Sequence, residues 1–237
     1  MIGVIVLFIV SWLLIWFFEK GNLSVLGFLP GKSIVNLAVI VFFITSLCCA
    51  SGYLIKWYYS IEVYQLNPDI SPGLVFKGLK SNFISVLTEE LLCRGVGLYI
   101  LLKKLGTKWG ILISSMVFGV LHWFNLGVWG NISQMAMLFS FTFVMGLLLA
   151  YAFVRTGSIL VPLAIHLGWN LTQNFIFPDG PFGEHLLVKG LPQPAEITVS
   201  YFVFFMIFLF PELSAILLDY LVVKKYTSQK ISGDKKL

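Results

Sequence analysis

The chain has 237 residues, of which 58% are hydrophobic and 11% are charged, and its formal net charge is +5. Soluble domains carry about 25% charged residues, so the composition excludes an ordinary soluble protein and indicates a polytopic membrane protein. The basic residues cluster at the ends of apolar segments and in the tail, where they orient helices in a bilayer. We therefore expect the lipid bilayer as a partner, and no nucleic acid.

The apolar segments predict an all-α fold, a polytopic bundle of about seven to eight transmembrane helices. In chain order they cover residues 2–18, 34–55, 83–102, 109–124, 133–154, 159–177 and 197–223. The last segment is long for one span and contains Pro211, so it is either one tilted, kinked helix or two pieces. A short surface helix is expected near 74–79, and a proline-rich loop over 178–196.

This arrangement predicts a single transmembrane domain over 1–223, in which residues 83–177 form the core that carries the motifs. The remaining segment, 224–237, is predicted to be a polar, basic C-terminal tail.

Two carboxylates and a guanidinium, Glu89, Glu90 and Arg94, interrupt the third apolar segment. Each charge at mid-membrane costs roughly 2.5–3.5 kcal/mol on insertion scales, so such a group is expected to face the protein interior and to have a function. Glu90 and Arg94 are four residues apart and can pair on one helix face, which makes Glu90 structural. Glu89 lies about 100° further around the helix and is favoured as a desolvated base. A cluster that snorkels to the interface is the simpler alternative.

The three cysteines, Cys48, Cys49 and Cys93, all lie inside apolar segments. Their number is odd and their spacing is not that of metal ligands, so neither disulfides nor a cysteine metal site is expected. Cys93 lies within the charged motif, and a thiol nucleophile is therefore an alternative to a carboxylate base.

Two further apolar segments carry polar side chains that can belong to a site. His122 lies near the end of the fourth segment, and His166 and Asn170 lie four apart on one face of the sixth, with Asn174 extending that stripe. If successive segments cross the membrane in opposite directions, these side chains and Glu89 reach a similar depth. The simpler interpretation of each histidine and asparagine is an interhelical hydrogen bond.

Three remaining polar residues receive structural interpretations. Glu212 follows Pro211 and is interpreted as an interfacial acid, Asp219 as a side chain that snorkels near the basic tail, and His185 as a solvated loop residue.

A carboxylate, two histidines and an asparagine at one depth suit the hydrolysis of an amide. Glu89 with His122 can hold and deprotonate a water, and His166 and Asn170 can donate to the oxyanion, a role worth about 3–4 kcal/mol per donor in a dry site. Alternatively, Glu89, His122 and His166 could bind zinc, with water as the fourth ligand. The specific zinc signal His-Glu-x-x-His is absent from the sequence, so the cofactor is either zinc or none.

These residues resemble the CPBP family of intramembrane proteases, which comprises the type II CAAX prenyl endopeptidases and the bacterial bacteriocin-processing and self-immunity proteins. The family pattern is Glu-Glu-x-x-x-Arg, then Phe-x-x-x-His, then His-x-x-x-Asn. All three motifs are present in that order, as Glu89 to Arg94, Phe118 to His122 and His166 to Asn170.

The resemblance implies an all-helical membrane endopeptidase of the glutamate or the metal-dependent type, since family members have been described as both. It assigns Glu89 as the base beside His122, and His166 and Asn170 as the oxyanion site, with Arg94 steadying the carboxylates. The implied substrate is a membrane-associated prenylated, leader or pheromone-type peptide, and the implied location is a bacterial cell membrane, which the protein crosses several times.

Two other functions remain open at this point. One is a non-catalytic binding protein of the same fold, such as a bacteriocin-immunity factor or a partner of a membrane sensor kinase. The other is a small proton-coupled transporter that uses the Glu and His side chains as a relay. A transporter of this kind predicts inverted repeats, and the sequence shows no internal repeat.

Overall fold

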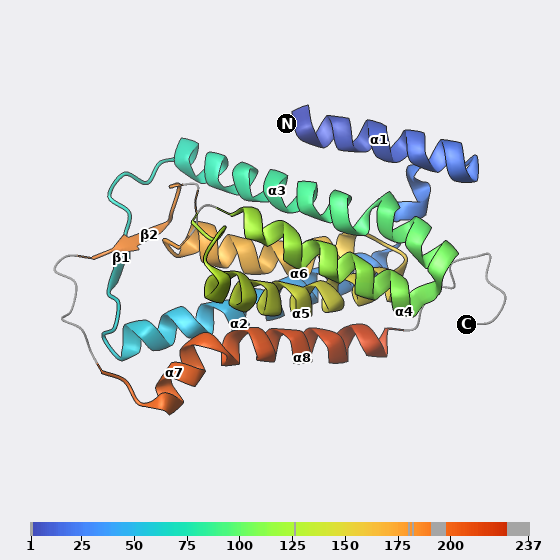
Figure 1. Ribbon diagram of the computed structural model, residues 1–237. Coiled ribbons are helices and arrows are strands. Elements are labelled where there is room, and N and C mark those ends of the chain that lie inside the picture. The colour runs from blue at the N-terminus through green and yellow to red at the C-terminus, as the bar shows by residue number, and fades with distance from the viewer. Residues whose placement is uncertain (1, 126, 180, 182, 191–197, 227–237) are drawn as a thin grey trace. The chain divides into compact units, whose positions relative to one another are not determined.

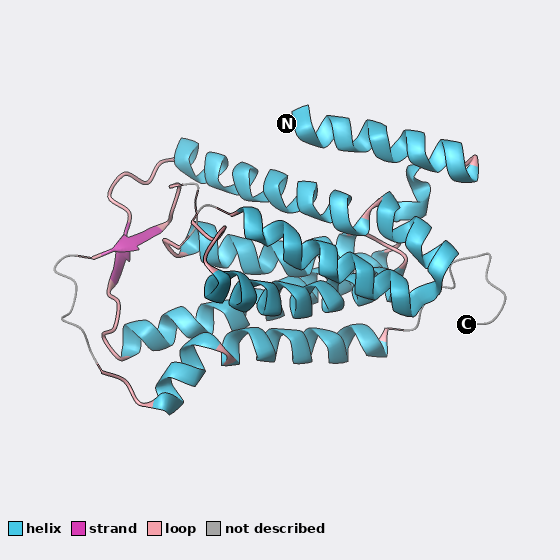
Figure 2. Ribbon diagram, in the orientation of Figure 1, coloured by secondary structure: helices cyan, strands magenta, loops and turns pink. Residues whose placement is uncertain are grey.

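The computed structural model describes residues 2–125, 127–179, 181, 183–190 and 198–226. These residues are mostly helical, which confirms the all-α prediction at this level (Figures 1 and 2). The helices are α1 (Ile2–Glu19), α2 (Lys32–Tyr58), α3 (Pro72–Arg94), α4 (Val96–Leu121), α5 (Ile132–Thr156), α6 (Leu160–Leu171), α7 (Tyr201–Phe208) and α8 (Phe210–Lys225). The short elements are η1 (Leu23–Leu26), η2 (His122–Phe124), the π-helical turn η3 (Thr172–Ile176), and the strands β1 (Tyr64–Leu66) and β2 (Leu187–Lys189).

Helices α1, α2 and α5 confirm the first, second and fifth predicted segments to within a few residues. By length and composition, α2 and α5 can each cross a membrane, and α7 with α8, bent by 48° at their junction, make a third candidate among the described helices. The predicted count of seven or eight spans is therefore not confirmed. The bend between α7 and α8 shows that the last apolar segment is two pieces.

The prediction of one continuous helix over 83–102 is wrong. Helix α3 ends at Arg94, and α4 begins at Val96 after Gly95, which has φ −75° and ψ −140°. A Cβ at Gly95 would lie 2.1 Å from the carbonyl oxygen of Leu91, so this close approach requires glycine. The charged motif therefore lies at the end of a helix, next to the interruption between α3 and α4.

The regions on the two sides of this break compare differently with the prediction. The expected short helix near 74–79 is the beginning of α3, which starts at Pro72, where the first turn tolerates proline. The expected boundary between the third and fourth segments is present within α4, where Gly106, with φ +79° and ψ +171°, is non-helical and separates two helical pieces. Residues 191–197 of the proline-rich loop and 227–237 of the predicted tail lie outside the described residues.

The described residues form two compact units, and the prediction of one domain over 1–223 stays a prediction. The first unit comprises the described parts of Met1–Val39, Leu87–Ala164 and Tyr220–Leu237. Within it, α4 and α5 lie side by side (Figure 1). Glycines allow this close packing, because a Cβ at Gly119 would lie 2.7 Å from the ring of Phe139 and one at Gly146 would lie 3.2 Å from Ser115.

The second unit comprises the described parts of Ile40–Val86 and Ile165–Asp219. It contains the antiparallel ladder of β1 and β2, in register Tyr64 with Lys189 (Figure 2). Tyr53 stacks on Phe177 with ring centroids 4.2 Å apart, and Tyr64 and Cys49 belong to the same buried cluster. The ladder was not expected, because three-residue strands from segments far apart in the chain leave no local signal.

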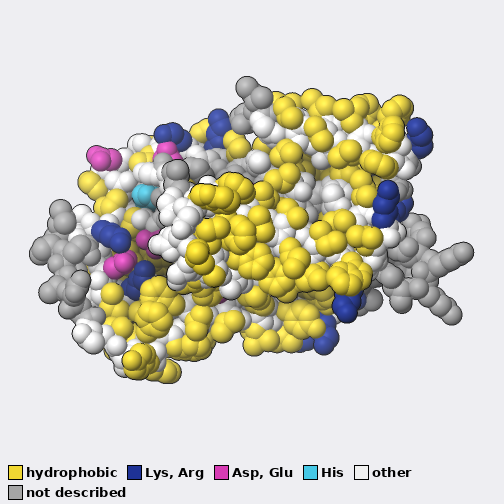
Figure 3. All heavy atoms as spheres, in the orientation of Figure 1, with side chains coloured by type: hydrophobic (Ala, Val, Ile, Leu, Met, Phe, Trp, Pro, Cys, Tyr) yellow, Lys and Arg dark blue, Asp and Glu magenta, His cyan; other side chains and the backbone are white. Residues whose placement is uncertain are grey.

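The outer surface of the helices is apolar over large areas (Figure 3). Exposed hydrophobic side chains occur along α1, α2 and α7, among them Phe17, Leu47 and Phe202. Monomeric soluble proteins rarely expose contiguous apolar patches of such extent, so this surface fits contact with lipid.

Candidate functional site

The first feature of the candidate site is a buried ion pair at the end of α3, in the first unit. Arg94 Nη1 donates to Glu90 Oε1 over 3.1 Å, and both side chains are completely buried. The residues are four apart in the helix, as the sequence predicted. A buried pair of this kind is expensive to break, because removing one partner leaves a buried charge behind.

Arg94 also contacts the two helices that pack beside it in this unit. Its Nη2 donates to the carbonyl oxygen of Gly146 in α5 over 3.4 Å. The centre of its guanidinium lies 4.0 Å from the ring centroid of Phe118 in α4, a cation–π contact. Arg94 thereby connects the charged end of α3 to the helix that carries the second motif.

Phe118 in turn holds His122, the residue that follows α4. His122 Nδ1 lies 2.8 Å from the carbonyl oxygen of Phe118, and the two rings meet edge to face with centroids 4.5 Å apart. A carbonyl oxygen can only accept, so Nδ1 carries the hydrogen. The other ring nitrogen, Nε2, lies near a second partner.

That partner is Glu89, which the structure brings close to His122. Glu89 Oε2 lies 3.9 Å from His122 Nε2, and the two side chains are 31% and 19% exposed. This separation is too long for a direct hydrogen bond, but one water at about 2.8 Å from each atom would fit between them. The partial exposure of both side chains admits such a water.

The other two predicted residues, His166 and Asn170, lie one helical turn apart on α6 in the second unit. His166 is buried and Asn170 half-buried. The following turn, η3, is a π-helix, a rare element that often marks functional sites. That His166 and Asn170 share one site with Glu89 and His122 stays a prediction.

Comparison with known families decides the identity of this region. Residues 71–172, which include all three motifs, match the model described as type II CAAX prenyl endopeptidase Rce1-like. This segment is similar to the Rce1-like family. The predicted assignment to the CPBP family is thereby confirmed. No curated protein and no solved structure matches the chain significantly.

The Rce1-like family is a family of membrane proteases. The match of residues 71–172 to this family supports an enzyme of the hydrolase class. Together with the apolar helices, it supports an integral membrane location.

The described residues do not group metal-ligating side chains into one site. Among them, no three His, Cys, Asp or Glu side chains are grouped so that they could hold one ion. Glu89 and His122 lie close together, and the predicted zinc set requires His166, which lies in the second unit, as the third ligand. That Glu89, His122 and His166 bind zinc stays a prediction.

The alternative nucleophile is disfavoured by its surroundings. Cys93 is buried, with only 3% of its surface exposed, and its carbonyl oxygen accepts a hydrogen bond of 2.8 Å from Ser114. Its position thus serves the packing of α3 on α4, whereas Glu89, four residues earlier in the chain, is partly exposed and lies close to His122.

Two structural interpretations from the sequence are wrong. Asp219 does not snorkel: it is completely buried, 2.6 Å from the hydroxyl of Thr45. His185 is half-buried rather than solvated, and its Nδ1 lies 3.0 Å from the carbonyl oxygen of Asn174. Glu212, interpreted as interfacial, is 8% exposed.

Sequence reasoning also missed residues that support the Rce1-like motifs. At the charged end of α3, the carbonyl oxygen of Gly146 accepts a hydrogen bond from Arg94, and the hydroxyl of Ser114 donates one to the Cys93 carbonyl oxygen. The carbonyl oxygen of Phe118 orients His122. The available signal was the occurrence of small residues inside apolar helices, which marks close helix packing.

Proposed function

We propose that this protein is an intramembrane endopeptidase that hydrolyses a peptide bond of a membrane-associated prenylated, leader or pheromone-type substrate. In this proposal Glu89 and His122 activate water, and His166 and Asn170 stabilise the oxyanion. The observation that carries it is the separation of 3.9 Å between Glu89 Oε2 and His122 Nε2. The match of residues 71–172 to the Rce1-like family supports the reaction class.

The hydrogen bond to Phe118 determines how a water would be oriented between the two side chains. With the hydrogen on Nδ1, a neutral His122 offers a lone pair at Nε2. A water there donates one hydrogen to His122 Nε2 and the other to Glu89. Both hydrogens are then engaged, and the lone pairs of the water oxygen are left to attack a carbonyl carbon.

The reaction follows from this orientation. As the water oxygen bonds to the carbonyl carbon, Glu89 takes one of its protons and the carbonyl oxygen becomes an oxyanion, which His166 and Asn170 stabilise by donating hydrogen bonds. When the carbon–nitrogen bond breaks, the proton on Glu89 passes to the leaving nitrogen. The products are a carboxylic acid, which keeps the second proton of the water and passes it to the amine or to solvent, and the amine, and Glu89 returns to its starting state.

The contacts of Arg94 support the same assignment of roles. Its cation is already engaged with Glu90, Gly146 and Phe118. It therefore acts as a positioning residue: it holds Phe118, whose carbonyl oxygen orients His122.

The proposal is tested by cleavage of prenylated and leader-type reporter peptides in proteoliposomes, with and without a chelator. We expect Glu89→Gln to lower kcat by at least about a hundredfold, a typical contribution of a general base. Glu62→Gln, which removes a carboxylate in the second unit, is the matched control and should cleave as the wild type does. An unchanged rate in Glu89→Gln would contradict the proposal. Absence of cleavage by folded wild-type protein would favour a binding function.

A further inference from the structure

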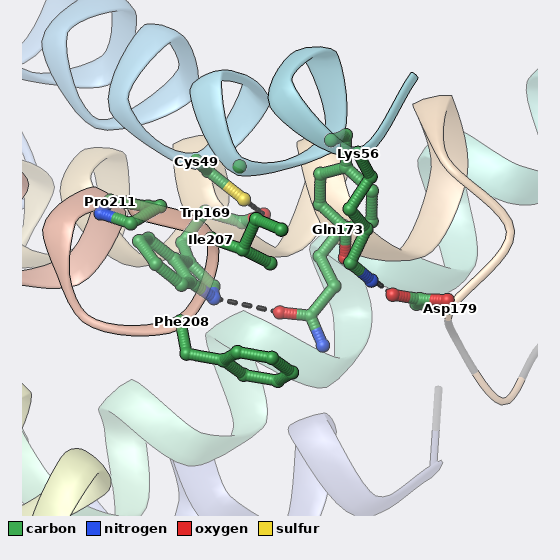
Figure 4. A pocket seen from close by; sticks show the side chains of 10 residues that line it. Cys49, Lys56, Trp169, Gln173, Asp179, Ile207, Phe208 and Pro211 are labelled. Atoms are coloured by element: carbon green, nitrogen blue, oxygen red, sulfur yellow. Dashed lines mark hydrogen bonds between the residues drawn. The ribbon is translucent and has the colours of Figure 1, made fainter. Parts of the chain in front are cut away.

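A pocket of about 160 Å³ lies within the second unit, between the end of α2, the end of α6 with η3, and the junction of α7 and α8 (Figure 4). One side is apolar and includes Trp169, Ile207 and Phe208. The polar part of the lining includes Gln173, Asp179 and Lys56. None of these six residues has a role in the proposed chemistry.

Two of the polar groups are held in fixed orientations. Trp169 Nε1 donates to Gln173 Oε1 over 2.8 Å, which turns the amide nitrogen of Gln173 away from the indole (Figure 4). Tyr53 donates its hydroxyl hydrogen to Asp179 Oδ2 over 2.8 Å. The polar side thus presents an amide donor and a carboxylate acceptor, the two kinds of group that a peptide backbone needs as partners.

The charge of the lining is balanced. Lys56 and Asp179 lie at the same side of the pocket in Figure 4, and their charges cancel. Lys56 also pairs with Glu62, with Nζ and Oε1 3.6 Å apart. A charged ligand group would gain little electrostatic attraction from this lining, so the pocket suits an uncharged group.

Size and shape limit that body to one large side chain. A cavity of about 150 Å³ lined by apolar side chains is large enough for benzene, and this pocket is of similar volume. Part of its wall is closely packed. Tyr53 stacks on Phe177, and a Cβ at Gly52 of α2 would lie only 3.0 Å from atoms of Ile207 and Pro211.

We propose that this pocket binds one large apolar side chain, aromatic or aliphatic, of the peptide substrate, while Gln173 and Asp179 hydrogen-bond the backbone beside it. This inference rests on the proposed endopeptidase function and names a specificity site for it. Trp169 precedes Asn170, and Gln173 follows it by less than one turn of helix. Since an extended peptide advances about 3.3 Å per residue and a helix about 1.5 Å, the bound side chain lies about one to three residues from the scissile bond.

The test compares two phenylalanines of α7. Phe208 lines the pocket and is 54% exposed, whereas Phe202 is 69% exposed and does not line it. Both can therefore be replaced by alanine at little cost to the fold. Three peptides are compared in proteoliposomes, which differ only in having Phe, Leu or Ala at one position near the scissile bond. The measured quantity is kcat/KM for cleavage, with the varied position moved along the peptide.

We expect Phe208→Ala to lower kcat/KM for the Phe and Leu peptides by about tenfold through KM, and to leave the Ala peptide unchanged. Phe202→Ala should behave as the wild type. Gln173→Glu keeps the acceptor for Trp169 but loses the amide donor, so it should raise KM for all three peptides. Equal cleavage of the three peptides by wild type and Phe208→Ala would overturn the proposal.

Binding to the Glu89→Gln variant, measured by fluorescence anisotropy with the same labelled peptides, separates this inference from the proposed chemistry. Tighter binding of the Phe peptide that Phe208→Ala abolishes supports the pocket even where wild type cleaves nothing. Absence of binding of all three peptides overturns it. If Phe208→Ala instead removes a preference for prenylated over unprenylated peptide, the pocket holds the isoprenoid chain and the proposal is wrong.

Discussion

Two charged clusters of this protein lie in opposite surroundings. In the first unit, Glu90 and Arg94 form a pair in which both side chains are completely buried. In the second unit, Glu62 lies between Lys56 and Lys189, at 3.6 and 3.3 Å, with 18–45% of each side chain exposed. The number of ionic contacts is therefore a poor guide to their importance, because water can replace a partner in the second cluster but not in the first.

The largest effect is expected where the buried pair is broken. Arg94→Ala should lower the free energy of unfolding by about 3–5 kcal/mol, because the carboxylate of Glu90 loses its guanidinium inside the protein. Unfolding in mixed detergent micelles measures this change. Arg94→Lys retains a charge but not the planar contact with Phe118, and we expect a smaller loss of stability together with reduced activity. A loss below about 1 kcal/mol for Arg94→Ala would show that the pair is not buried as described.

The interruption between α3 and α4, beside the buried pair, offers a second test. Gly95→Ala places a Cβ 2.1 Å from the carbonyl oxygen of Leu91, so the end of α3 has to move, at a cost of about 1–3 kcal/mol. The matched control is Gly97→Ala, where the nearest atom lies 3.8 Å away within α4. That change should be neutral or stabilising, because alanine favours a helix. Equal stability of the two variants would mean that Gly95 is not needed for the break.

Sequence alone predicted the parts of this fold that depend on composition over long windows. The apolar runs that became α1, α2 and α5 are bounded by turn residues or charges, and both signals are local. The break at Gly95 was missed because a glycine within an apolar run is compatible with a helix, and only the position of the Leu91 carbonyl oxygen excludes one. The pairing of β1 with β2 depends on contacts between distant segments.

The candidate site was predicted unevenly for the same reason. Spacing of four residues gave the pair of Glu90 with Arg94, and the motif pattern gave Glu89 with His122. The hydrogen bond from His122 to the Phe118 carbonyl oxygen involves backbone, which any residue supplies. The burial of Asp219 depends on how α8 packs, which the sequence does not show. It was interpreted as snorkelling because the basic residues Lys224 and Lys225 follow it in the same helix.

Asp219 shares one property with each cluster. It is completely buried, like Glu90, but its described contact is the hydroxyl of Thr45 and not a cation, so we expect its removal to have an intermediate or small effect. The Thr45 hydroxyl lies 2.8 Å from the carbonyl oxygen of Val41 and 2.6 Å from Asp219 Oδ2, but it has one hydrogen. Both contacts are satisfied together when Asp219 carries a proton and donates it to Thr45. We therefore expect Asp219→Asn to change stability little, and Thr45→Val to cost about 1 kcal/mol, in the same unfolding assay. A loss above about 3 kcal/mol for Asp219→Asn would indicate an ionised carboxylate.

The smallest effect is expected in the exposed cluster. Burial raises the pKa of Glu62, but the Tyr64 hydroxyl, Lys56 and Lys189 outweigh it, so this pKa lies below its usual range. Burial and the nearby Glu62 carboxylate raise the pKa of Tyr64, so its hydroxyl stays protonated and donates to Glu62.

A lowered pKa in the folded state stabilises the protein above the unfolded-state pKa of about 4.3, and this stability is lost as the pH falls through the folded-state pKa. Glu62→Gln should therefore cost about 0–1 kcal/mol at pH 7, less at high salt, with the difference from wild type disappearing below about pH 4. Unfolding measured against pH and salt tests this. A difference that persists at pH 3, or one as large as that of Arg94→Ala, would show that exposure does not separate the two clusters.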